Sequence, residues 1–213
     1  MNLETIMNLP GGSVVRVTVE RDLSRPSYDD FCCDVEEHLI NAIINLEQNK
    51  SVFHTLGEDQ LSTIILTWLK GAGLDAEHDS NRNGHVDFLV KSGRFNWLGE
   101  AKLDDGPAYV MEGFRQLCDR YSDGNGFSSK GAVIVYTSKQ SKLDFLDGWM
   151  DYLVSNYEIA VARHERCLQT LSEITSHVHP ATGLRYQVRH FPVSMYYKPT
   201  DKSARNSRSK KKA

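Results

Sequence analysis

The sequence predicts one α/β domain built on a mixed β-sheet. Two segments, 28–48 and 57–72, carry apolar residues at helical spacing, and they are followed by shorter stretches of alternating or apolar residues. The run GAVIVYT at 131–137 is continuously apolar, which is typical of a strand buried on both faces. The chain of 213 residues, 40% hydrophobic and 25% charged, is long enough for one sizeable core and excludes a disordered protein.

Periodicity and turn residues justify each expected element. Spacings of three and four residues indicate helices, and alternation bounded by glycine, proline or asparagine indicates strands. The turn at Ser92-Gly93 joins two of the extended pieces. In chain order we expect a strand at 14–20, helices at 28–48 and 57–72, extended pieces at 74–78, 85–91 and 94–102, a helix at 107–121, a strand at 131–137, a helix at 144–154 and a hairpin of 172–179 with 184–191.

The order of the expected elements divides the chain into a core, two extensions and a tail. We expect an N-terminal extension at 1–56, a core at 57–157, a C-terminal helix and hairpin extension of the same domain at 158–200, and a disordered basic tail at 201–213. The tail has six basic residues and one acidic residue, a net of +5, which leaves 19 basic and 27 acidic residues, a net of −8, for the body. The tail is either a solvated segment or a phosphate-binding one. Its cations are Lys202, Arg205, Arg208, Lys210, Lys211 and Lys212.

The composition also indicates the cellular compartment of the protein. No apolar run approaches the roughly 18 residues of a membrane span, and the first residues lack the pattern of a secretory leader. The four cysteines form no CxxC motif, so we expect reduced thiols. A cytoplasmic protein without a membrane partner is therefore expected.

Two carboxylates and one ammonium are predicted to meet at the end of the small sheet. Asp87 stands in the 85–91 strand, and Glu100 and Lys102 end the 94–102 strand. Because side chains alternate along a strand, Glu100 and Lys102 share a face, and the hairpin can place Asp87 beside them. Crowded carboxylates favour a divalent cation such as Mg²⁺ (or Mn²⁺). The alternative is an ordinary charged strand end with a solvated Glu–Lys pair.

This arrangement resembles the PD-(D/E)XK, or restriction endonuclease-like, nuclease superfamily. Its signature is Asp, a spacer, then Glu-x-Lys, which Asp87, Glu100 and Lys102 match, while Val86 stands where the motif has Pro. The resemblance covers roughly 57–137 and implies a core of helix, three strands, helix and strand. It also implies a Mg²⁺-dependent endonuclease in which Asp87 and Glu100 hold the metal and Lys102 positions the nucleophile.

Three further residues are candidates for this site. The resemblance implies a carboxylate from the first helix, for which Glu58 is the candidate, although the spacing from Thr55 also fits a capping box. Gln116 lies in the next helix, where some superfamily members keep a Gln, but a helical wheel favours a solvated face. His85 alternates onto the face of Asp87, where it is either a substrate contact or a simple strand histidine.

Two other metal-binding patterns are disfavoured. Residues 79–87 resemble the first half of an EF-hand loop, but the twelfth position is Val90 instead of Glu. His177, His179 and His190 lack a nearby Cys or carboxylate in sequence, which favours histidines packed in a hairpin.

The resemblance leads us to expect hydrolysis of phosphodiester bonds, with DNA as the substrate. The expected context is a phage-defence effector that forms a homo-oligomer, a dimer or higher, with other defence-system subunits as candidate partners. The alternatives are a Holliday-junction or repair nuclease, and a non-catalytic nucleic-acid-binding or assembly subunit on the same fold.

Overall fold

The computed structural model describes residues 19, 27–79 and 84–201. The predicted strand at 14–20, apart from Val19, and the six basic tail residues lie outside this part of the chain. In chain order the elements are α3 (Tyr28–Gln48), α4 (Lys50–Phe53), α5 (Glu58–Gly71), β1 (Asp75–Asp79), β2 (Val86–Ser92), β3 (Phe95–Leu103), α6 (Pro107–Arg115), the π-helical turn η1 (Gln116–Tyr121), β4 (Lys130–Thr137), α7 (Lys142–Asn156), β5 (Ala162–Cys167), β6 (Ser172–Val178) and β7 (Arg185–Ser194).

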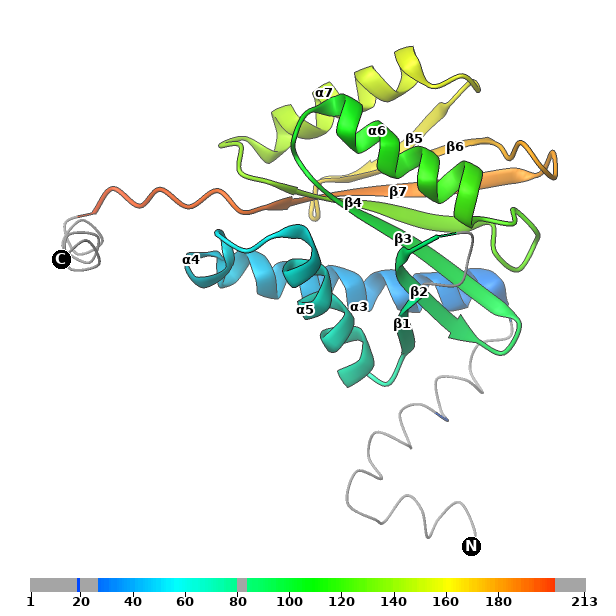
Figure 1. The fold of residues 1–213 in the computed structure, drawn as a ribbon, viewed down its shortest axis with the longest axis horizontal. Coiled ribbons are helices and arrows are strands. Elements are labelled where there is room, and N and C mark those ends of the chain that lie inside the picture. Colours follow the sequence, from blue (N-terminus) through cyan, green and yellow to red (C-terminus); the bar gives the residue numbers. More distant parts are fainter. Residues whose placement is uncertain (1–18, 20–26, 80–83, 202–213) are drawn as a thin grey trace, which may run out of the picture.

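A seven-stranded mixed sheet forms the middle of three layers (Figure 1). Its strand order is β1-β2-β3-β4-β7-β6-β5, with β4 parallel to both β3 and β7 and the other neighbours antiparallel. Helices α3 and α5 cover one face, and α6 and α7 cover the other. The predicted α/β class is therefore confirmed.

Each face of the sheet has its own apolar core. Side chains of α3 and α5, such as Leu39 and Ile65, pack against Ile134 of β4 on one face. On the other face, Phe114 of α6 and Trp149 of α7 pack over the opposite side chains of the same strands. Burial on both faces explains why β4 reads as a continuous apolar run.

The C-terminal part differs from the prediction in two ways. Within 158–200 the structure has no helix, because 162–167 forms the edge strand β5, in which Arg163 and Arg166 pair with the buried Glu173 of β6. The predicted hairpin is present as β6 and β7, and β7 pairs with β4, so the hairpin is part of the central sheet and not an addition to the core. In the described chain no helix is both long enough and apolar enough to cross a membrane.

Candidate active site

Strands β2 and β3 separate where the predicted carboxylates lie. Their paired register runs from Ser92↔Phe95 to Phe88↔Gly99, so Asp87 and the last residues of β3 lie beyond the ladder. The Asp87 Oδ2 atom accepts a hydrogen bond from the Ala101 N–H at 2.8 Å. A side chain thus takes the backbone donor that β2 leaves unpaired, and this bond fixes Asp87 beside β3.

Glu58, the first residue of α5, also accepts a hydrogen bond from a backbone N–H of β3. Its Oε2 atom accepts a hydrogen bond from the Leu103 N–H at 2.7 Å. The capping-box alternative for Glu58 is wrong, because the helix begins after Gly57 and the Gln60 Oε1 atom accepts the Gly57 N–H at 2.9 Å. Glu58 is therefore left to face the end of β3.

Glu100 and Lys102 share one face of β3 and are both buried. The Lys102 Nζ atom donates to Glu100 Oε1 at 2.6 Å and lies 3.6 Å from Glu58 Oε1. The side chains of Glu100 and Lys102 are only 2% and 10% exposed. The alternative of a solvated charged strand end is therefore wrong. The structure brings together Glu58, Asp87, Glu100 and Lys102.

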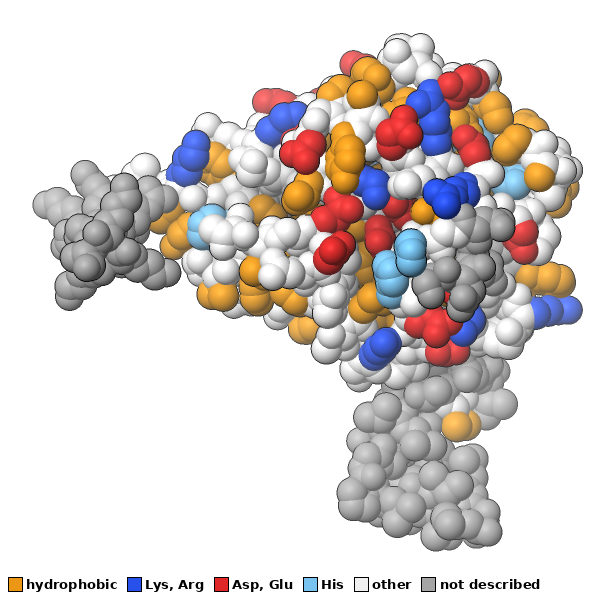
Figure 2. Space-filling model, in the orientation of Figure 1, with side chains coloured by type: hydrophobic (Ala, Val, Ile, Leu, Met, Phe, Trp, Pro, Cys, Tyr) orange, Lys and Arg blue, Asp and Glu red, His pale blue; other side chains and the backbone are white. Residues whose placement is uncertain are grey.

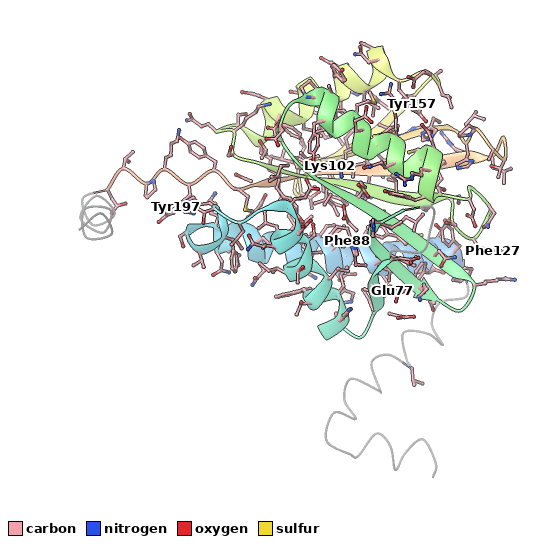
Figure 3. All side chains as sticks on the ribbon, in the orientation of Figure 1. Glu77, Phe88, Lys102, Phe127, Tyr157 and Tyr197 are labelled. Atoms are coloured by element: carbon pink, nitrogen blue, oxygen red, sulfur yellow. The ribbon has the colours of Figure 1, made fainter. Side chains whose placement is uncertain are left out.

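Helix α6 covers Glu100 and Lys102, and Figure 3 shows Lys102 between β3 and this helix. A Cβ atom on Gly113 would lie 2.7 Å from Lys102 Cγ and 3.4 Å from Glu100 Cγ. Only glycine allows the helix to approach so closely. One turn earlier, the half-exposed Tyr109 ring has its centroid 5.8 Å from Lys102 Nζ. Sequence reasoning missed both residues, although their four-residue spacing places them on one helix face.

The electrostatics of the cluster favour a cation. Burial, with the charge of Asp87, raises the pKa of Glu100 to about 8. Burial also raises the pKa values of Asp87 and Glu58. For Lys102, burial lowers the pKa, but the surrounding carboxylates, Glu100 first, outweigh that effect and leave it raised. The ammonium therefore stays charged, and three carboxyl groups share this one positive neighbour.

One buried oxygen of this cluster has no hydrogen-bond partner among the described residues, namely Glu100 Oε2. A desolvated carboxylate oxygen without a partner is costly, and a cation would compensate it. No group of three or more His, Cys, Asp or Glu side chains within the described ranges could hold a metal by itself. Asp87 and Glu100 supply two carboxyl groups, which is the number that Mg²⁺ often takes before waters and phosphate complete its shell.

The turn after α6 changes the position predicted for Gln116. The chain becomes π-helical from Gln116 to Tyr121, and Gln116 is half-buried, with its Oε1 atom buried and without a partner among the described residues. Burial and the charge of Glu100 raise the pKa of Tyr121, so this turn lies near the carboxylate cluster. The Gln116 side chain is thus less solvated than the helical wheel indicates.

Two histidines border the cluster on the side of β1. His85 is exposed and stacks on His78, with ring centroids 6.0 Å apart and planes 18° apart. The His78 Nδ1 atom lies 3.9 Å from Asp87 Oδ1. Sequence reasoning missed His78, because its proximity depends on the pairing of β1 with β2. Figure 2 shows acidic and histidine side chains gathered on this face of the molecule.

The three C-terminal histidines are buried among aromatic and polar side chains. His190 accepts from Trp149 Nε1 at 3.0 Å and contacts Thr175 Oγ1 at 2.8 Å, and His177 and His179 are buried beside Tyr186. The packed-hairpin interpretation fits these contacts.

Comparison with known proteins gives no relative from which a role could be transferred. No protein-family model, no curated protein and no solved structure matches the chain.

Proposed function

We propose that this protein is a metal-dependent nuclease that hydrolyses phosphodiester bonds of DNA. The observation that carries the proposal is the buried Glu100 carboxyl group, which lies where Asp87 leaves the β2–β3 ladder. One of its oxygens is bonded to Lys102, and the other has no partner in the part of the chain that the structure describes. The order α5, β1–β3, α6, β4 also supports a restriction endonuclease-like core. Both features agree with the resemblance seen in the sequence.

In this proposal each side chain has a distinct task. Asp87 and Glu100 would hold Mg²⁺, which when bound acidifies water and neutralises phosphate charge. The Lys102 ammonium, kept protonated by its carboxylate neighbours, donates a hydrogen bond to the attacking water or to a phosphate oxygen. Glu58 fixes the end of β3 and keeps the ammonium between two carboxylates.

The nuclease proposal is tested by Mg²⁺-dependent cutting of supercoiled plasmid DNA. Glu100→Gln and Asp87→Asn should lose cleavage, and both keep an acceptor in place of the carboxylate. Lys102→Ala should cut about 100- to 1,000-fold more slowly while still binding Mg²⁺ in calorimetry. The control is Glu77→Gln, because Glu77 is a half-exposed carboxylate on β1 paired with Lys91. Cleavage retained by both carboxylate variants would remove the site assignment.

A non-catalytic nucleic-acid-binding or assembly subunit is the second candidate. It is favoured by the fact that Asp87, Glu58 and one oxygen of Glu100 already have partners within the chain. If this is the function, the wild-type protein binds DNA without cutting it in Mg²⁺ or Mn²⁺. For the nuclease, we further propose a cytoplasmic role in phage defence, with repair or Holliday-junction resolution as the alternative role. We also propose that the protein acts as a dimer or a higher assembly.

A further inference from the structure

A groove of about 870 Å³ runs between α3 and α5 on their outer surface. These helices lie side by side beneath the sheet (Figure 1). The groove is formed by the C-terminal parts of both helices, so on α5 it lies at the other end from Glu58. All of its described lining residues come from these two helices and the cap of α5.

Most of the accessible surface of the groove is apolar, although His38, Asn41, Asn45 and Gln48 on α3 also line it, and none of its described lining residues is Lys, Arg, Asp or Glu. Ile44 and Trp68 remain 44% and 40% exposed. Thr63 and Thr67, which also line the groove, donate their hydroxyls to carbonyls of their own helix at 2.7 and 2.8 Å, so these polar groups are already satisfied. Ile44 and Trp68 therefore leave an exposed apolar strip inside a concave surface, and such a surface suits a convex apolar occupant.

We propose that residues 1–9 of the same chain, MNLETIMNL, dock in this groove. Leu3, Ile6 and Met7 have the spacing of one apolar helix face, the pattern by which a helix fills a hydrophobic groove. Pro10, followed by two glycines, ends that pattern. A nine-residue helix is too short to be stable in water alone, so it needs such a surface. Its apolar face suits the exposed Ile44 and Trp68 side chains of the groove.

The connecting chain is long enough for this docking. Ser27 precedes α3, and Ile44 lies about 26 Å further along the helix axis. The 17 residues of 10–26 can span up to about 60 Å when extended. The tether gives the segment an effective concentration of about millimolar, which a second copy of the chain does not reach in dilute solution. The segment of the same chain is therefore the favoured occupant.

Trp68 provides a direct probe, because the other two tryptophans, Trp97 and Trp149, are 0% and 2% exposed. Acrylamide quenching of the fluorescence is measured on the full-length chain. The test variant is Leu3→Asp with Ile6→Asp. The matched control, Thr5→Asp with Asn8→Asp, adds the same charge on the other side of the helical turn.

Wild type and control should show little quenching. In the test variant, the quenchable emission should rise to about one third of the total, the share of one tryptophan in three. Trp68→Phe, introduced into the test variant, should remove that increase, which assigns it to the groove. Equal quenching of wild type and test variant would overturn the proposal. Protection of wild type that disappears on dilution would also overturn it, in favour of the segment from a second copy.

Discussion

Replacing Glu100 with glutamine should stabilise the protein at alkaline pH and flatten the pH dependence of its free energy of unfolding. Burial, with the charge of Asp87, raises the pKa of Glu100 to about 8 in the folded protein, against an ordinary 4.5. Between these values the folded protein keeps a proton that the unfolded chain has released. Stability therefore falls as pH rises through this window, and it recovers as pH falls.

The magnitude follows from the width of that window. Each unit of pKa difference corresponds to about 1.4 kcal/mol. The interval from 4.5 to 8 therefore lowers the free energy of unfolding of wild type by on the order of 5 kcal/mol above pH 8. The attraction of Lys102 is already included in that pKa. Because about three units of the window lie between pH 5 and pH 9, the free energy of unfolding of Glu100→Gln, relative to wild type, should rise by about 4 kcal/mol between these two pH values.

Urea unfolding of both proteins at pH 5 and pH 9, with EDTA present, measures this difference. Glu77→Gln is the control, since its 43% exposed side chain should leave the pH dependence of wild type unchanged. Mg²⁺ added at pH 9 should stabilise wild type but not Glu100→Gln. Parallel pH dependence in wild type and Glu100→Gln would refute the argument that the Glu100 carboxyl is held protonated by burial.

Three further results are expected. Gly113→Ala should slow cleavage and lower the melting temperature together, because its Cβ would lie 2.7 Å from Cγ of the buried Lys102 side chain, and wild-type values in a cleavage time course and in thermal melting would contradict this. Burial lowers the pKa of His177 to about 4 and that of His190 to about 3, so unfolding should become easier as pH falls from about 6.5 toward 4, and His177→Leu should reduce that loss in urea titrations. Deleting 201–213 should flatten the slope of log affinity for duplex DNA against log salt by about 2–4, measured with Ca²⁺ in place of Mg²⁺, and equal slopes would exclude phosphate contact by the tail.

In the C-terminal part, the sequence predicted the local structure but not the burial of His177 and His190. The hairpin of β6 and β7 could be predicted, because turn residues and alternating apolar residues are local signals. Its place beside β4 could not be predicted, since that pairing joins Lys130–Thr137 to Arg185–Ser194 across more than fifty residues. The burial of His177 and His190 under Phe114 and Trp149 depends on that placement.

The sequence by itself determined the α/β class, the helices α3 and α5, and the grouping of Asp87 with Glu100 and Lys102. These depend on periodicity and on a tight turn, which act over a few residues. Only the tertiary structure decided that Glu100 and Lys102 are buried and that α6 passes close enough above them to require Gly113. Burial sets the pKa values of the cluster, and it depends on which distant segment covers a strand end. No local pattern in the sequence records that choice.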